Sequence, residues 1–415
     1  MNEILKKVRT LNIDKFVLFT IFLFINYPII QYIAYKLPIL SNEFSLKMVQ
    51  LFIYACLLLC YVLLAINNLK FLKKSLMIIF VLILLSFLVD NSFLLERINI
   101  IVRYMINCFM LFSVLYMYGN KDKAIVHFHR TIILNLLLCG LYYFLMRNNR
   151  VELAAQGQTL SYIISLYLII AVYFVFREFT WKDFICIVLD LILIFQFGSR
   201  TILLVVCLYF IFELIMFIYK FYCKANKENK KRILVSLFVI VVMIVLLLIN
   251  MQNIAVCLYS YLNKHGVYNR FIRLLAEGGF LSTSSGRVDS FYSVIFEDIL
   301  KHPFGKGLAY DRVVIYNTNV LNGGLANFEG CYSHNIILEY FSTFGIPIGL
   351  FLMVLGIKEF VKVFKESEDK DILILFIFIG CVPLLLTSSF LVYKNFWIFI
   401  AMFLIIKKGK KYEKS

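Results

Sequence analysis

Long apolar runs recur along this chain, and they constrain its fold more than any other feature of the sequence. An α-helix needs about 20 apolar residues to cross roughly 30 Å of hydrocarbon. We therefore predict an all-α membrane protein, a single polytopic domain over residues 1–415 with about 12 transmembrane helices. The expected spans are residues 16–33, 45–66, 76–95, 98–118, 125–146, 159–176, 181–197, 201–219, 233–250, 334–357, 371–388 and 391–406.

Composition supports this reading independently. Apolar residues make up 62% of the chain, and 42 phenylalanines in 415 residues exceed what a soluble core can hide. The first apolar run, which follows Lys15, reaches spanning length and lacks a small-residue cleavage site. We expect it to be retained as the first membrane helix.

Basic residues are distributed unevenly between the connections of these spans. Most of the 42 Lys and Arg residues fall in alternate connections and in the two terminal segments. Because cytoplasmic connections carry the Lys and Arg excess, both termini are predicted to be cytoplasmic in this multi-pass protein. The net charge of +17 then reflects membrane topology and contact with anionic lipid. Nucleic acid is not an expected partner, and the run Lys220–Arg232 is read as a cytoplasmic loop.

One long connection, residues 251–333 between the ninth and tenth spans, is predicted to be an extracytoplasmic loop. It is rich in Arg, Tyr, Gly and Asn, so it is the expected place for the active site. Apolar spacing within it predicts an amphipathic helix from Arg287 to Leu300, capped by Ser284 or Ser285 and stopped by Pro303. Backbone N–H groups of the following turn, residues 302–307, are candidates for an anion nest.

Charged residues within or beside the spans are a second source of candidates, because ionisable groups are costly in hydrocarbon. Arg103 lies below the outer end of the fourth span, and its alternative reading is snorkelling to the headgroups. Asp190 is read either as functional or as a buried partner of an Arg or Tyr, and Glu213 as a packing residue. Arg200 stands where two spans meet with almost no connection, a position that suits a lipid-linked phosphate.

Metal-ligand spacings of Cys and His are absent from the sequence. Most cysteines lie within spans as small apolar residues. Cys257 and Cys331 flank the outer loop, and whether they form a disulfide is left open.

Ser333-His334-Asn335 opens the tenth span, with Glu339 one turn further along. A lone histidine at a helix start is usually a cap or a surface residue. Here it shares the outer face with several arginines, and a neutral imidazole near pH 7 is a suitable proton acceptor for a sugar hydroxyl.

The order of these motifs resembles the O-antigen polymerase and O-antigen ligase family of membrane glycosyltransferases. Gly198-Ser199-Arg200 opens a span, Gly286-Arg287 and Pro303-x-Gly305-x-Gly307 lie in the outer loop, and His334-Asn335-x-x-Leu338-Glu339 leads into Gly345-x-x-x-Gly349. The likeness is close over about residues 190–350 and elsewhere rests only on the number of helices. Phe291 stands where the family often has Trp a few residues after the loop arginine.

The resemblance implies a lipid-sugar glycosyltransferase-like helix bundle and a transfer that needs neither metal nor cofactor. It also implies that the donor and acceptor are polyprenyl-diphosphate-linked oligosaccharides at the outer face of the bacterial cytoplasmic membrane. Arg200 and Arg287 are expected to hold the diphosphate, because the planar guanidinium binds phosphate through two hydrogen bonds. His334 is expected to act as general base. The remaining expected substrate-binding residues are Arg270, Arg273, Asn335, Glu339 and Arg103.

Within the family we expect a polymerase of undecaprenyl-diphosphate-linked repeat units for a bacterial surface polysaccharide, such as O-antigen, capsule or exopolysaccharide. A ligase that transfers a finished glycan uses the same chemistry and is the first alternative. A polysaccharide flippase or transporter, from a different class, would show paired halves, midplane charges and broken helices. A flippase and a chain-length regulator are the protein partners that this reading implies.

Overall fold

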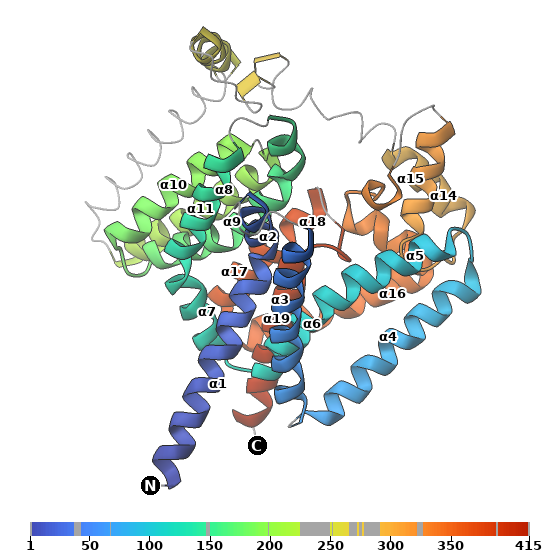
Figure 1. The fold of residues 1–415 in the computed structure, drawn as a ribbon, viewed down its shortest axis with the longest axis horizontal. Coiled ribbons are helices and arrows are strands. Elements are labelled where there is room, and N and C mark those ends of the chain that lie inside the picture. The colour runs from blue at the N-terminus through green and yellow to red at the C-terminus, as the bar shows by residue number, and fades with distance from the viewer. Residues whose placement is uncertain are drawn as a thin grey trace. The chain divides into compact units, whose positions relative to one another are not determined.

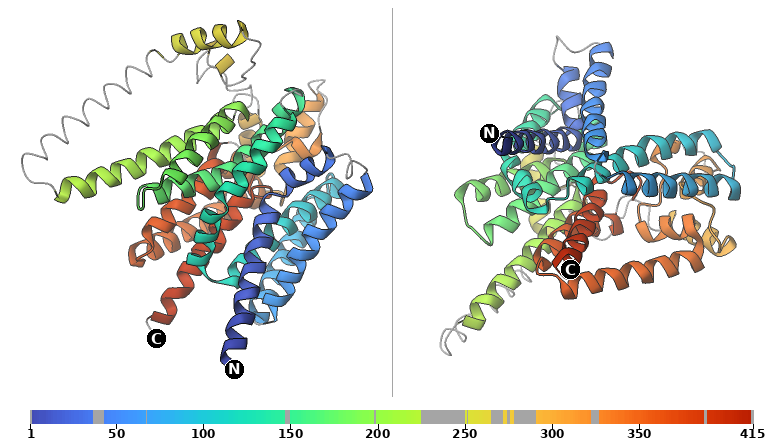
Figure 2. Two further views of the ribbon diagram at one scale, coloured as in Figure 1. Left: turned by 60° about the vertical axis from the view of Figure 1, so that its left-hand side comes forward. Right: turned by 90° about the horizontal axis from the view of Figure 1, so that it is seen from below.

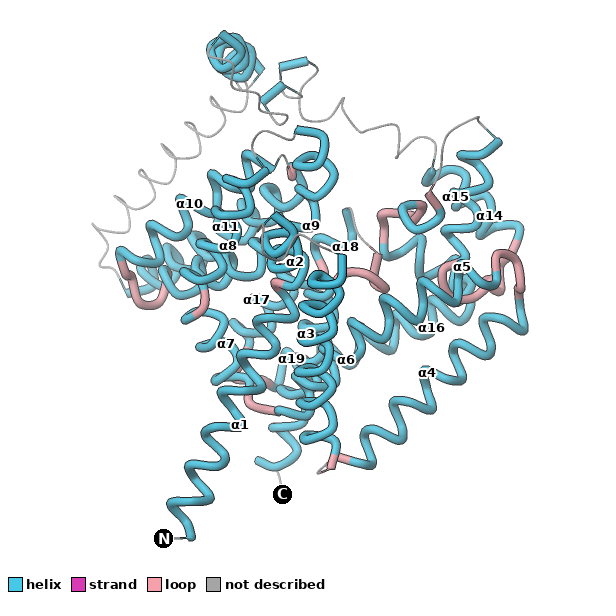
Figure 3. The backbone as a smooth tube through the Cα atoms, viewed as in Figure 1, coloured by secondary structure: helices cyan, strands magenta, loops and turns pink. Residues whose placement is uncertain are grey.

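The computed structural model consists of helices joined by turns and loops over the residues that it describes (Figures 1 and 3). These are residues 2–36, 43–66, 68–146, 150–197, 199–224, 250, 252–264, 272–273, 276–277, 291–321, 327–386 and 389–413. Within these ranges no residue belongs to a strand. The predicted all-α fold class is therefore confirmed for the described part of the chain.

The chain forms two compact units, and the first combines residues 1–128 with residues 286–415. The N-terminal end of α1 and the C-terminal end of α19 point to the same end of this unit (Figures 1 and 2). The helices of its first segment are α1 (Asn2–Ile25), α2 (Tyr27–Lys36), α3 (Glu43–Ala65), α4 (Leu69–Val89), α5 (Leu94–Ile100), η1 (Ile101–Met105), α6 (Ile106–Tyr118) and α7 (Lys121–Arg130), whose last residues belong to the second unit. Those of its second segment are α14 (Ser293–Lys301), α15 (Tyr310–Leu321), η3 (Phe328–Gly330), α16 (Ile336–Glu366), α17 (Lys370–Gly380), α18 (Val382–Leu386) and α19 (Lys394–Glu413).

The second unit, residues 129–285, is built around α9 (Arg150–Val175). Every residue from Leu166 to Val172 is at most 1% exposed, because α8, α10 and α11 all pack against this helix. The surrounding helices are α8 (Ile132–Met146), α10 (Trp181–Phe197) and α11 (Arg200–Lys224), and residues 252–264 are also helical.

Helices coincide with each predicted span that lies in the described residues. Five of them are long and apolar enough to cross a membrane, or up to seven if each bent helix pair counts as one span. The predicted span 233–250 lies outside the described residues except for its last position. The chain is a multi-pass α-helical membrane protein, and the exact count of twelve spans stays a prediction.

The region predicted as an outer loop is folded wherever it is described. α14 and α15 pack against each other and against α16, and Ile295, Ile299 and Ile315 are buried between them with Cys331. α14 ends at Lys301, just before Pro303, as the sequence predicted, whereas the expected start of this helix lies outside the described residues. α15 was not predicted. Residues 291–321 are therefore a packed helical layer and not an exposed connector.

A break divides α16 at Gly345, which has φ 74° and ψ 171°. This conformation is essentially restricted to glycine. The following Pro347 has no N–H group and fits the first turn of the second half of the helix. Irregular backbone at membrane depth is tolerated only where it is buried in protein or lines a cavity. Gly345 is buried, as this requirement demands.

All ten cysteines are free thiols in this structure, including Cys257 and Cys331. These two belong to different units of the chain, so whether they can form a disulfide stays open.

Candidate active site

Asn335 is the N-cap of α16. Its side-chain oxygen accepts hydrogen bonds from the backbone N–H groups of Ile337 (2.9 Å) and Leu338 (3.3 Å). Its side-chain nitrogen donates to the carbonyl of Leu385 at 3.2 Å. These contacts satisfy N–H groups that a helix start otherwise leaves without partners. Capping is therefore done by Asn335, and His334 is the residue before the cap.

His334 has a backbone φ of 53°, in the left-handed region that non-glycine residues rarely adopt. Its ring lies 3.9 Å from the ring of Tyr332, centre to centre, and the residue is only 8% exposed. Its carbonyl accepts a hydrogen bond of 3.4 Å from the Tyr292 hydroxyl, which belongs to the turn before α14. Packing and hydrogen bonds thus fix both the backbone and the ring of this histidine.

Two charged residues at the start of α15, Asp311 and Arg312, are fully buried beneath this turn. The Asp311 carboxylate accepts from the backbone N–H of Ser333 at 2.9 Å. The Arg312 guanidinium lies 5.1 Å from the centre of the Tyr332 ring. Burial raises the pKa of the Asp311 carboxyl, although the charge of Arg312 and the hydrogen bonds from Ser333 partly offset this effect.

Sequence reasoning missed these two residues because they sit in a segment of low hydropathy that lies outside the predicted spans. The one usable signal was an acidic residue, Asp311, next to an arginine and four residues after the Gly305-x-Gly307 sequence. An acidic side chain in a first helical turn is favourable for the helix dipole, which marks a helix start.

Glu339 lies in the first turn of α16 and is fully buried. Its carboxylate accepts hydrogen bonds from the Ser389 hydroxyl and from the backbone N–H of Phe390 at 2.9 Å. This residue therefore fastens the start of α16 to the turn that precedes α19.

The Pro303–Gly307 turn closes the break in α16. Lys306 and Gly307 donate their backbone N–H groups to the carbonyls of Ser342 (3.0 Å) and Thr343 (3.1 Å), and Ile346 donates to the carbonyl of Pro303 at 2.7 Å. These are the peptide groups that lose helical partners at the break. The expected anion nest is wrong for this reason: the N–H groups of residues 305–307 already have partners within the protein.

Arg97, at the end of α5, holds the same turn from the other side and is fully buried. Its guanidinium donates twice to the carbonyl of Leu308 (2.9 and 3.1 Å), once to that of Lys306 (3.0 Å) and once to that of Asp90 (2.9 Å). The Lys306 ammonium in turn reaches the Asp90 carboxylate at 3.1 Å. Burial acts to raise the pKa of Asp90, but hydrogen bonds from Ser92 and Lys306 outweigh it and lower the pKa.

The other predicted site residues are placed as follows. Arg103 is an exposed residue of η1 in the first unit. Arg200 is the first residue of α11, and Arg273 pairs with Glu277 at 3.4 Å; both belong to the second unit. Arg270 and Arg287 lie outside the described residues. The structure thus brings His334, Asn335 and Glu339 together at one helix start, and the roles of the arginines stay predictions.

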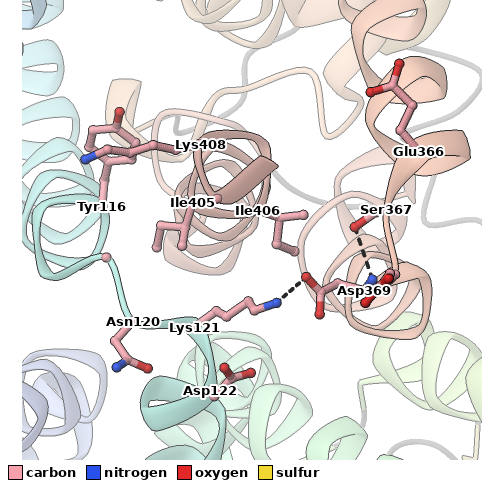
Figure 4. A pocket seen from close by; sticks show the side chains of 13 residues that line it. Tyr116, Asn120, Lys121, Asp122, Glu366, Ser367, Asp369, Ile405, Ile406 and Lys408 are labelled. Atoms are coloured by element: carbon pink, nitrogen blue, oxygen red, sulfur yellow. Dashed lines mark hydrogen bonds and ion pairs between the residues drawn. The ribbon is translucent and has the colours of Figure 1, made fainter. Parts of the chain in front are cut away.

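A separate pocket of about 500 Å³ lies at the other end of α16 (Figure 4). An ion pair between Lys121 and Asp369 joins the start of α7 to the α16–α17 turn beside it. α16 has 31 residues, so this pocket and His334 are separated by roughly 45 Å of helix. The pocket is lined by Tyr116, Gly119, Asn120, Lys121, Asp122, Glu366, Ser367, Glu368, Asp369, Ile405, Ile406, Lys408 and Gly409.

These features define a multi-pass membrane protein with a fixed, buried histidine turn at the start of a broken helix. Residues 185–354 match the family model described as O-antigen ligase. Over these residues the chain therefore carries an O-antigen ligase domain, consistent with the O-antigen polymerase and ligase family, whose members are glycosyltransferase-like membrane enzymes. No curated protein and no solved structure matches it. The match includes the His334 turn and excludes every residue that lines the pocket of Figure 4.

Proposed function

We propose that this protein polymerises oligosaccharide repeat units linked to undecaprenyl diphosphate, at the outer face of the bacterial cytoplasmic membrane. The observation that carries the proposal is that the O-antigen ligase domain contains a histidine in a strained, packed turn, directly before the cap of α16. A non-glycine residue in the left-handed region costs on the order of 1–3 kcal/mol, and such strain concentrates at functional sites.

In the proposed reaction, the acceptor hydroxyl oxygen attacks C1 of the donor sugar. The new C1–O bond forms as the bond from C1 to the diphosphate oxygen breaks. His334 takes the proton of the acceptor hydroxyl, and the polyprenyl diphosphate leaves with the bonding electron pair. Arg200 and Arg287 stabilise the negative charge that develops on the diphosphate, because guanidinium groups bind phosphate oxygens in pairs.

Asp311 and Glu339 have positioning roles in this proposal. Asp311 holds the N–H of Ser333, the residue before His334, and Glu339 fastens the first turn of α16 after it. A general base works only when its nitrogen is held within hydrogen-bond reach of the acceptor hydroxyl. Fixing the chain on both sides of His334 supplies such positioning.

His334→Asn tests the proposal in membrane vesicles supplied with the lipid-linked repeat unit. We expect transfer to fall by roughly 10²- to 10⁴-fold, the usual scale for loss of a general base. Asparagine also tolerates the left-handed backbone of this position, so the variant should still fold. His302→Asn, in the same folded region and 40% exposed, is the matched control and should keep normal activity. Normal turnover in His334→Asn would show that the base lies elsewhere.

The diphosphate roles are tested by Arg200→Ala and Arg287→Ala, each of which should abolish polymer while the protein still inserts. Lysine at either position should rescue activity only in part, because it keeps the charge and loses the two-pronged hydrogen bonding. Full activity of an alanine variant at matched expression would remove that arginine from the proposed site.

Ligation is the second candidate, and the description of the matching family favours it. The two functions differ in their acceptor: a polymerase extends a lipid-linked repeat unit, whereas a ligase transfers a finished glycan to another molecule. Glycan profiling of a deletion strain separates them. Single-repeat products support the polymerase, unattached long chains support the ligase, and material trapped at the inner face would indicate a flippase instead of either.

A further inference from the structure

A small pocket of about 160 Å³ opens beside η1. Its lining comes from α5, from η1 and from the segment that precedes α16. Five of the six lining residues carry polar or aromatic side chains: Glu96, Asn99, Arg103, Asn327 and Phe328, with Ile100 as the sixth. Such a pocket combines a few convergent hydrogen-bonding groups with an aromatic surface, as small-molecule sites commonly do.

A π-helical turn contributes one of the residues that line the pocket. Residues Ile101–Met105 form η1 between α5 and α6, and Arg103 lies in this turn. A π-helical turn holds more residues per turn than an α-helix and occurs frequently at functional sites. Arg103 is exposed here and reaches the pocket together with Asn99 of the preceding helix.

The aromatic wall of the pocket is held rigidly. The Phe328 ring stacks on Phe93 with 5.4 Å between ring centres and an angle of 17°, and it meets Tyr316 edge-on at 5.5 Å. Phe93 and Tyr316 also contact each other edge-on at 5.3 Å. Each ring therefore packs against the two others, which fixes the face that Phe328 offers.

α15 connects this wall to the His334 turn. Tyr316 follows Asp311 by five positions on the helix, a rise of roughly 7.5 Å. Asp311 contacts Ser333 at 2.9 Å, and Tyr316 contacts Phe328 at 5.5 Å. The pocket thus lies within about 15–20 Å of the turn, a span that a short oligosaccharide covers.

We infer that this pocket is a binding subsite for one sugar ring of the glycan, some sugar units away from the bond that is made. The inference rests on the proposed function. Arg103, Asn99 and Asn327 donate hydrogen bonds to sugar hydroxyls, the Glu96 carboxylate accepts from them, and the apolar face of the ring packs on Phe328. A volume of 160 Å³ equals the space of roughly five waters, which is room for one ring and not for an oligosaccharide.

A direct binding measurement tests the subsite apart from catalysis. The probe is the repeat-unit oligosaccharide released by mild acid from the lipid-linked pool of a deletion strain, titrated into the purified full chain in nanodiscs. Arg103→Ala and Asn327→Ala should each raise its Kd by about 10-fold or more, the effect of losing one good polar contact. Asn317→Ala, an exposed residue of α15 that does not line the pocket, is the matched control and should leave Kd unchanged.

Kinetics provide a second readout, because a contact remote from the reacting bond is made equally in the ground state and in the transition state. Both variants should raise KM for the lipid-linked substrate while kcat holds. Unchanged Kd in both variants, or no binding by the wild type, would overturn the subsite. Binding that depends on Arg103 and Asn327 in a protein that does not polymerise would keep the subsite and overturn the proposed function.

Discussion

The carboxylate of Asp311 accepts a hydrogen bond from the backbone N–H of Ser333 at 2.9 Å, which joins α15 to the residue before His334. Both partners are buried, with Asp311 only 1% exposed. A buried carboxylate must keep its hydrogen bonds, since an unsatisfied buried polar group costs about 1–3 kcal/mol. The position of the His334 turn therefore depends on a helix that the sequence did not reveal.

Asp311→Asn should reduce the pH dependence of stability. Burial raises the pKa of Asp311 in the folded protein, whereas an unfolded aspartate titrates near 4. A raised folded pKa means that this residue's contribution to stability is fully present below about pH 4 and is lost as the pH rises through the folded value. The melting temperature of the wild type should fall as the pH rises over this range, and the melting temperature of the asparagine variant should fall by a smaller amount. Thermal unfolding in detergent from pH 4 to pH 8 measures both, and parallel curves would contradict the prediction.

Gly345→Ala and Gly356→Ala should have opposite effects, although both glycines lie in α16. A Cβ at Gly345 would meet the Phe304 carbonyl carbon at 2.3 Å and the Pro303 oxygen at 2.4 Å, in a conformation restricted to glycine. A Cβ at Gly356 meets nothing within 4 Å. We expect Gly345→Ala to lower the free energy of unfolding by about 2 kcal/mol or more and Gly356→Ala to raise it by about 0.5–1 kcal/mol. The melting temperatures of both variants and the wild type, measured in the same detergent, test this prediction. Equal changes in the two variants would show that the Pro303–Gly307 turn can move to make room for a side chain at position 345.

Arg97→Ala should be among the most destabilising single substitutions in the first unit. It removes the donors for the carbonyls of Leu308, Lys306 and Asp90 and leaves a cavity, a loss of roughly 3–5 kcal/mol. Arg97→Lys should recover only part of this loss, because an ammonium cannot reproduce the geometry of the guanidinium. Arg130→Ala, at an exposed position of α7, is the control and should unfold as the wild type does. If Arg97→Ala unfolds at the same temperature as the Arg130→Ala control, contacts other than those of Arg97 hold the Pro303–Gly307 turn.

Membrane topology is testable by cysteine labelling of whole cells that carry a cysteine-depleted variant. The charge pattern places Lys227, which lies outside the described residues, in the cytoplasm and the loop of residues 251–333 outside. Asn317→Cys should therefore react with an impermeant maleimide before lysis, and Lys227→Cys only after lysis. Labelling of Lys227→Cys in intact cells would reverse the predicted orientation.

The fold class and the family could be predicted from the sequence because their signals are local. A helix that crosses a membrane must form its backbone hydrogen bonds internally and present apolar side chains to lipid. Each span is therefore encoded by one continuous run of mostly apolar residues. The predicted span 76–95 is such a run, and α4 (Leu69–Val89) covers residues 76–89 of it. His334, Asn335 and Glu339 likewise lie within six residues of one another, and the start of their helix could be predicted from the sequence.

Only the tertiary structure decided what surrounds this motif. Arg97 falls in the short connection between the predicted spans 76–95 and 98–118, yet it is fully buried and hydrogen-bonded to residues more than 200 positions away. The Pro303–Gly307 turn was read as an anion site, although its N–H groups belong to the broken α16. Buried polar groups are stabilised by partners distant in the sequence, and no pattern of neighbouring residues encodes which partners these are. Spans and motifs follow from the sequence by itself, whereas the hydrogen bonds that hold the His334 turn and the Pro303–Gly307 turn exist only once α5, α15 and α16 have packed together.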